Sequence, residues 1–110
     1  RHLDDFPEQV RTLLRAALLS GDARADRVAS LLSIHPRTLN RRLNPYGLSY
    51  QTLLDNCRFE MAQQMLKDSD LKISEIALVL HYADARSFIQ AFRRWCNTTP
   101  ARWRAAQKQR

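Results

Sequence analysis

The chain has 110 residues, 45% of them hydrophobic and 26% charged, so it can bury a core as one domain or two very small subdomains. No apolar run approaches the roughly 20 residues that span a bilayer, and no secretory leader opens the sequence. The two glycines are too few for a phosphate-binding glycine loop, a dinucleotide fingerprint or an all-β fold. We therefore expect a cytoplasmic protein that lies outside the membrane and outside several common enzyme classes.

The charge is strongly basic and unevenly distributed. Eighteen Lys and Arg side chains stand against 11 Asp and Glu, which gives a net charge of +7, and 15 of the 18 are Arg. Residues 85–110 hold seven basic side chains and no acidic one, and Arg37, Arg41 and Arg42 form a second cluster. Because the guanidinium group matches phosphate and guanine in geometry, an anionic partner is indicated. A merely solvated face is the alternative at this point.

The residue types that could carry catalysis or bind metal are scattered. His2, His35 and His81 fall in three different predicted elements, and none has a second ligand one helical turn away. Cys57 and Cys96 have no second Cys or His at a metal-ligand spacing, and both sit in helical patterns where a small apolar side chain would serve. We expect no enzyme, no catalytic residue, no metal and no cofactor, and we expect both cysteines to be reduced.

Apolar residues recur every three or four positions and no stretch alternates as a strand would, so the sequence predicts an all-α fold of about seven helices. Glycine, proline and polar capping residues mark the helix ends, with Gly21 stopping the first helix and residues 44–47 stopping the third. The predicted helices begin near Pro7, Val28, Pro36, Ser49, Ile73, Asp84 and Thr99. The longest, from Ser49 to Lys67, would measure about 28 Å at 1.5 Å per residue.

A short helix, a turn and a second helix occur twice, at residues 26–43 and 73–95. The matching positions are Ala29 and Ala77, Ile34 and Tyr82, Leu39 and Phe88, and Leu43 and Phe92. The second copy has one more residue between its alanine and its first large apolar residue. A small residue in the first helix and an apolar residue in the turn are typical of a helix-turn-helix, whose second helix enters the DNA major groove. The sequence thus predicts two helix-turn-helix subdomains, 1–48 and 68–110, joined by a linker helix at 49–67.

The buried face of each second helix determines which side chains project from it. The residues predicted to contact bases are Arg37, Asn40 and Arg41 in the first copy and Arg86, Ile89 and Gln90 in the second. The residues predicted to contact phosphates are Thr38, Arg42, Ser87, Arg93 and Arg94. Arg pairs with guanine, and Asn or Gln pairs with adenine, through two hydrogen bonds.

A long linker helix would hold the two copies rigidly apart. Both recognition helices would then enter successive major grooves, about 34 Å apart on one face of double-stranded DNA. One chain would read two grooves without dimerising, and its target would need no palindrome. The alternative is a helical module that binds nucleic acid without specificity or docks an acidic protein partner.

A wider set of residues repeats a known pattern. The set consists of Val28-Ala29, Ile34, Pro36 to Leu39, Arg41 to Leu43, Gly47, Arg58, Ala62, Leu66, Glu75 to Ala77, Ser87-Phe88, Ala91 to Trp95, Thr99-Pro100 and Arg104. With these residues the chain, from about Pro7 to Arg104, resembles the C-terminal DNA-binding domain of the AraC/XylS family of bacterial transcription regulators. The resemblance implies a sequence-specific regulator of promoter DNA, more often an activator than a repressor, with RNA polymerase as a further partner. It also implies an N-terminal sensing or dimerising domain, which would make this chain a fragment.

Several positions depart from the family pattern. The family usually has glycine where this chain has His81 and Asn97, at helix ends that favour a left-handed residue. Histidine there costs strain unless the turn differs, whereas Asn tolerates the conformation better. His35 replaces a common Ser as the cap of the first recognition helix, and Gln90 replaces a frequent Arg. We therefore expect base reading mainly from the first copy, while the second grips phosphate or touches a thymine methyl through Ile89.

Two features at the C-terminal end have a structural and a DNA-binding interpretation. Trp95 and Trp103 are expected to fill the space between the last two helices rather than to stack on bases. The basic residues from Arg102 to Arg110 fit either a solvated helix end or a phosphate contact. The helical periodicity does not distinguish the two.

Overall fold

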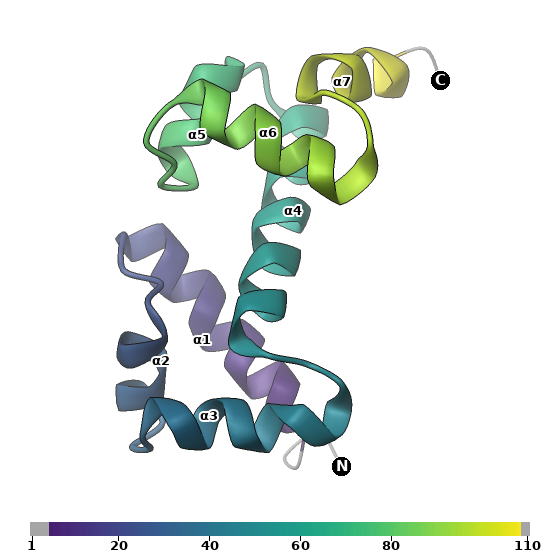
Figure 1. Ribbon diagram of the computed structural model, residues 1–110. Coiled ribbons are helices and arrows are strands. Elements are labelled where there is room, and N and C mark those ends of the chain that lie inside the picture. Colours follow the sequence, from purple (N-terminus) through teal and green to yellow (C-terminus); the bar gives the residue numbers. More distant parts are fainter. Residues whose placement is uncertain (1–4, 109–110) are drawn as a thin grey trace. The chain divides into compact units, whose positions relative to one another are not determined.

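A computed structural model describes residues 5–108 (Figure 1). Within that range the backbone forms seven α-helices and no strand, which confirms the predicted all-α fold. The elements are α1 (Phe6–Ser20), α2 (Ala25–Leu31), α3 (Pro36–Leu43), the 3-10 helix η2 (Asn44–Tyr46), α4 (Tyr50–Asp68), α5 (Ile73–Val79), α6 (Ala85–Cys96) and α7 (Pro100–Lys108). His2 and Arg110, which entered the sequence analysis, lie outside the described residues.

The chain separates into two compact units, Arg1–Cys57 and Arg58–Arg110. The boundary falls inside α4, which therefore supplies core residues to both units. Leu53 belongs to the first part of this helix and Leu66 to the second, and both are fully buried. We refer to the two parts as unit 1 and unit 2.

The helix ends follow the capping chemistry that the sequence predicts. Ser49 Oγ accepts a hydrogen bond from the backbone N–H of Thr52 at 3.2 Å. Asp84 accepts one from the backbone N–H of Ser87 at 2.8 Å, and Thr99 plays the same role at the start of α7. Each cap satisfies one of the backbone donors that a helix leaves unpaired in its first turn. The predicted starts of α4, α6 and α7 are therefore confirmed.

Each helix of unit 1 turns one apolar face inward. The fully buried side chains are Val10, Leu14 and Leu18 of α1, Val28 and Ala29 of α2, Leu39 and Leu43 of α3, and Leu53 and Cys57 of α4. Burial of Leu39 and Leu43 fixes the rotation of α3 about its axis, because residues four apart lie on one face of a helix. Cys57 is 1% exposed and is not part of a disulfide, and its burial confirms its predicted place in the core.

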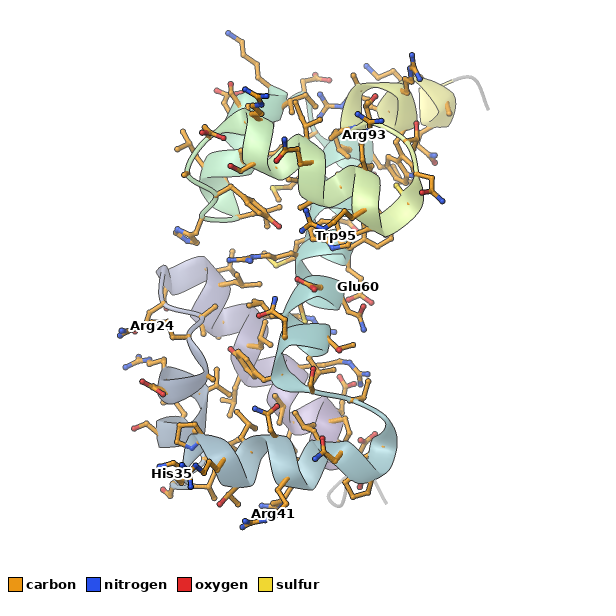
Figure 2. All side chains as sticks on the ribbon, viewed as in Figure 1. Arg24, His35, Arg41, Glu60, Arg93 and Trp95 are labelled. Atoms are coloured by element: carbon orange, nitrogen blue, oxygen red, sulfur yellow. The ribbon has the colours of Figure 1, made fainter. Side chains whose placement is uncertain are left out.

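Unit 2 is built around aromatic side chains of α6. Phe88 and Phe92 are fully buried, and their ring centroids lie 5.9 Å apart in an edge-to-face arrangement. Trp103 of α7 packs edge-on against Phe92 at 6.3 Å, as predicted for the space between the last two helices. Trp95 instead points from α6 toward α4, where its ring centroid lies 5.6 Å from that of Phe59 (Figure 2). The two tryptophans thus attach α6 to two different helices.

Arg104 closes the end of the long helix. Its guanidinium donates to the carbonyl oxygens of Leu66, Met65 and Ser69 at 2.9, 3.3 and 3.3 Å. The last carbonyls of a helix have no partner within it and carry the negative end of its dipole, so a cation with several donors stabilises them. This arginine of the basic tail therefore has a structural role, which the helical periodicity alone did not reveal.

Candidate nucleic-acid interface

Both helix pairs close through the same backbone hydrogen bond. In unit 1 the N–H of Ile34 donates to the carbonyl of Ala29 at 3.0 Å, and in unit 2 the N–H of Tyr82 donates to the carbonyl of Ala77 at 2.9 Å. Both alanines are fully buried, and both turn residues are half-buried. The small side chains allow a close helix crossing, and the apolar turn residue covers the angle between the helices. The structure confirms both predicted helix-turn-helix motifs.

Each turn contains a left-handed residue four positions after the alanine. Ser33 has φ 60° and His81 has φ 65°. His81 therefore has the left-handed conformation expected at this helix end, at a cost of about 1–2 kcal/mol for an L-residue. Ser33 was not anticipated, although its distance from Ala29 equals that of His81 from Ala77. Comparison of the two copies could therefore have predicted a left-handed residue at Ser33.

The second turn is one residue longer, as the sequence predicts, and both recognition helices are capped. The turn occupies residues 32–35 in unit 1 and residues 80–84 in unit 2. His35 Nδ1 accepts a hydrogen bond from the backbone N–H of Arg37 at 3.1 Å, which confirms its expected place as the cap of α3. At α6 the cap is Asp84, and the backbone hydrogen bond from Ser87 holds the pKa of Asp84 below its ordinary value.

The outer face of α3 carries two exposed arginines. Arg37 and Arg41 are both exposed, and neither forms an ion pair with a described residue. The Arg41 guanidinium donates to Oγ1 of the half-buried Thr38 at 3.3 Å, one turn earlier on the same helix. Figure 2 shows Arg41 extending outward from α3. The side chains of Arg37 and Arg41 are therefore open to solvent, and their contact with DNA stays a prediction.

Two other predicted contacts on α3 are already engaged inside unit 1. The side-chain oxygen of Asn40 accepts a hydrogen bond from the backbone N–H of Tyr50 at 2.8 Å. A two-bond pair with adenine uses that oxygen and the amide nitrogen, so a base contact by Asn40 would have to share its oxygen with Tyr50. The guanidinium of Arg42 lies 4.0 Å from the ring centroid of Phe6, a cation–π contact that still leaves its N–H groups able to donate to phosphate.

Tyr50 is a positioning residue that sequence reasoning missed. Its side chain is 4% exposed, and its hydroxyl donates to the carbonyl oxygen of Ala23 at 2.6 Å. Through its backbone N–H and its hydroxyl, Tyr50 ties the start of α4 to α3 and to the segment before α2. A single tyrosine at a helix start carries no periodic signal, and its partners are distant in sequence.

The outer face of α6 carries the second set of predicted contacts. The exposed members are Arg86, Gln90, Arg93 and Arg94, and the half-buried members are Ser87 and Ile89. None of the arginines in this set pairs with an acidic side chain among the described residues. The α6 helix therefore presents a basic face interrupted by one partly buried apolar residue.

Other kinds of site find no support in the part of the chain that the structure describes. No group of three or more His, Cys, Asp or Glu side chains is placed to hold a metal ion there. None of the described helices is long and apolar enough to cross a membrane. Two helix-turn-helix motifs whose recognition helices expose arginine define an interface for duplex nucleic acid.

Comparison with known proteins agrees with this assignment. A model of the helix-turn-helix domain matches residues 28–106. The HTH-type transcriptional regulator VirS of Mycobacterium tuberculosis is 37% identical over 98 residues, which cover 89% of this chain and 29% of that protein. A DNA-binding transcriptional dual regulator from Escherichia coli K-12 superposes with a TM-score of 0.87 at 27% identity, covering 96% of this chain and 94% of the other. The DNA-binding domain of AdpA, solved in complex with a target DNA, superposes with a TM-score of 0.75 at 26% identity, covering 91% and 93%.

These matches establish the family. The chain belongs to the AraC/XylS family of helix-turn-helix transcription regulators and has the fold of their DNA-binding domain. It spans about three tenths of the length of the curated relatives VirS and the ornithine utilization regulator of Pseudomonas aeruginosa (29% and 31%).

Proposed function

We propose that this chain binds promoter DNA in a sequence-specific manner, with its two recognition helices in adjacent major grooves of one duplex. The observation that carries the proposal is the duplicated motif, in which the same turn hydrogen bond recurs and each second helix exposes arginine on its outer face. A single helical hairpin is common in proteins that bind no DNA. Two matched copies with basic outer faces favour a reader of two neighbouring grooves.

The two recognition helices have different roles, with α3 making the main base contacts. Arg37 and Arg41 of α3 read bases, since both guanidinium groups are exposed and unpaired by carboxylates. On α6, Arg86 and Gln90 face the groove and Ile89 contacts a thymine methyl group. The phosphate contacts are Thr38, Arg42, Ser87, Arg93 and Arg94. Asn40 also reads a base, through its amide nitrogen and the second lone pair of an oxygen that already accepts from Tyr50.

The wider setting of this domain is also a proposal. The domain acts in the bacterial cytoplasm as part of a longer regulator that includes an N-terminal sensing or dimerising domain. Its coverage of only 29% of VirS and 31% of the ornithine utilization regulator supports a longer protein. We propose activation of transcription, with RNA polymerase as a second partner, and assign the domain no catalytic step.

Selection from a random duplex library followed by hydroxyl-radical footprinting tests the proposed binding mode. The expected result is one enriched, non-palindromic sequence that the monomeric chain protects over two successive major grooves. Competition against random duplex from 50 to 200 mM salt gives the specificity ratio, because the non-specific phosphate component weakens steeply with salt. Equal affinity for the selected and the random duplex across that range would support the alternative of a non-specific module. Protection of a single groove would confine recognition to one unit.

A further inference from the structure

A hollow lies at the C-terminal end of the second recognition helix. It has a volume of about 420 Å³ and is lined by Gln90, Arg93, Arg94 and Asn97. These positions follow the spacing i, i+3, i+4 and i+7, so they form one stripe along the surface of α6 and the residue that ends it. No hydrogen bond or ion pair joins any of the four side chains to another described residue. The hollow therefore gathers polar side chains whose hydrogen-bonding groups are not used by any residue that the structure describes.

The charge of the hollow suits an anion. Two guanidinium groups and two carboxamides line it, and residues 85–110 contain no acidic side chain. The carbonyl end of α6 is the negative end of the helix dipole, and Arg93 and Arg94 in the last turn offset it. Amide N–H groups and guanidinium forks together are the donors that proteins use for phosphate oxygens.

Asn97 contributes a side chain to this hollow at a position where its backbone conformation favours glycine. Its backbone has φ 64°, a left-handed conformation that glycine adopts without cost, and its N–H donates to the carbonyl of Arg93 at 2.8 Å. Glycine would thus serve the helix end as well or better. The asparagine side chain adds a carboxamide to the lining of the hollow.

With α6 in the major groove as proposed, its length would bring this hollow beside the DNA backbone. Twelve residues give α6 a length of about 18 Å, whereas the major groove is about 12 Å wide. When Arg86, near the start of α6, faces the base edges, the other end of the same stripe lies over the sugar-phosphate strand that borders the groove. We propose that the hollow is a phosphate-binding site in which Arg93, Arg94 and the Asn97 amide donate to a backbone phosphodiester of duplex DNA, with Gln90 at the edge that borders the groove. This inference rests on the proposed binding of duplex DNA.

The test is a set of variants bound to a random-sequence duplex, because a phosphate contact is independent of sequence. Asn97→Gly should weaken binding about threefold to tenfold, the value of one lost hydrogen bond, while the slope of affinity against salt stays the same. The melting temperature should rise or stay unchanged, because glycine relieves the left-handed backbone. Asn97→Asp, which keeps a side chain that tolerates this conformation, should weaken binding more strongly because its carboxylate repels phosphate.

The matched control is His81→Gly. This substitution also replaces a left-handed residue of unit 2 by glycine, but at a position outside the hollow. It should raise the melting temperature and leave affinity unchanged. If Asn97→Gly and Asn97→Asp both bind the random duplex within twofold of the parent chain, the asparagine serves the helix end alone and the inference is overturned. Because this measurement uses random duplex, it stays decisive even if the search for a specific promoter sequence fails.

A second experiment distinguishes a DNA phosphodiester from free inorganic phosphate as the occupant of the hollow. Binding of the random duplex is measured with inorganic phosphate and with chloride at equal ionic strength. Equal affinity in the two salts is expected, since one phosphodiester held by the whole interface outcompetes a free ion. A selective loss in phosphate that disappears in Asn97→Gly would show that the free ion competes with the duplex for the hollow and would also support the assignment. A selective loss that remains in Asn97→Gly would place the competing ion away from this side chain and count against it.

Discussion

The side-chain oxygen of Asn40 on α3 and the backbone N–H of Tyr50 on α4 are joined by a hydrogen bond of 2.8 Å. The N–H of Tyr50 is one of the donors that α4 leaves unpaired in its first turn, so Asn40 caps a helix ten residues further along the chain. The bond fixes α3, the first recognition helix, against the long helix. An exposed residue of α3 that is predicted to contact DNA thus also holds the structure of unit 1 together.

Removal of the hydrogen bond between Asn40 and Tyr50 should lower the stability of unit 1. Asn40→Ala is expected to lower the free energy of unfolding by about 1 kcal/mol, the usual cost of a lost cap. Asn40→Asp retains an acceptor oxygen and should lose much less. Urea unfolding followed by circular dichroism measures both. Equal losses for the two substitutions would mean that the amide nitrogen, and not the oxygen, is the important group.

Arg104 should be one of the most sensitive charged residues of unit 2. Its guanidinium donates to three carbonyls at the end of α4, and hydrogen bonds to charged groups contribute about 1.5–3 kcal/mol. Arg104→Ala is therefore expected to cost about 2 kcal/mol in thermal or urea unfolding. Arg102→Ala, an exposed arginine on the same helix, is the control and should change stability by less than about 0.5 kcal/mol. Similar costs for both would show that α7 needs only its net charge.

The fold and the interface differ in how far the sequence determined them. Leu39, Leu43, Phe88 and Phe92 repeat at helical spacing, so their burial and the orientation of both recognition helices could be predicted from local pattern alone. The bonds that connect Arg104 to Leu66 and Tyr50 to Ala23 span 38 and 27 residues. Such partners carry no periodic signal, because they depend on how the helices pack.

The same distinction explains the interface. Exposure of Arg37 and Arg41 follows from the burial of Leu39 and Leu43 on the opposite face of α3. The engagement of Asn40 does not follow, because it depends on where the next helix begins. Sequence pattern therefore predicts which face of a recognition helix is outward, while the structure decides which side chains on that face are available.

His81 is strained, and relief of that strain should stabilise unit 2. His81→Gly is expected to raise the free energy of unfolding by about 1 kcal/mol, because φ 65° lies in the left-handed region where glycine has no steric penalty. His81→Ala keeps the penalty and should give no gain. The comparison of melting temperatures between the two variants measures the backbone effect. A gain in both would mean that the imidazole, rather than the backbone conformation, is unfavourable.

Asp84 should make the stability of unit 2 depend on acidity. The hydrogen bond from the Ser87 N–H lowers the pKa of Asp84 in the folded chain, so its contribution is present above the ordinary carboxyl pKa of about 4. That contribution is lost as the pH falls through the lowered value, because the protonated carboxyl is a weaker acceptor. Asp84→Asn keeps a capping side chain without the titration. Urea unfolding from pH 6 to pH 3 should therefore show a smaller loss in the variant, and parallel curves would assign the acid sensitivity to other carboxylates.

The division between base and phosphate contacts predicts two different kinds of binding defect. Arg41→Ala should cost roughly 1–3 kcal/mol on the selected promoter sequence and relax the preference at one base position, because a base-reading guanidinium is lost. Arg94→Ala should weaken binding to all sequences alike and reduce the salt slope by about one, because a phosphate contact is lost. Both measurements use the same selected duplex and the same set of single-base changes within it. If Arg41→Ala weakens every duplex as uniformly as Arg94→Ala does, then α3 grips the backbone and base reading must lie elsewhere in the chain.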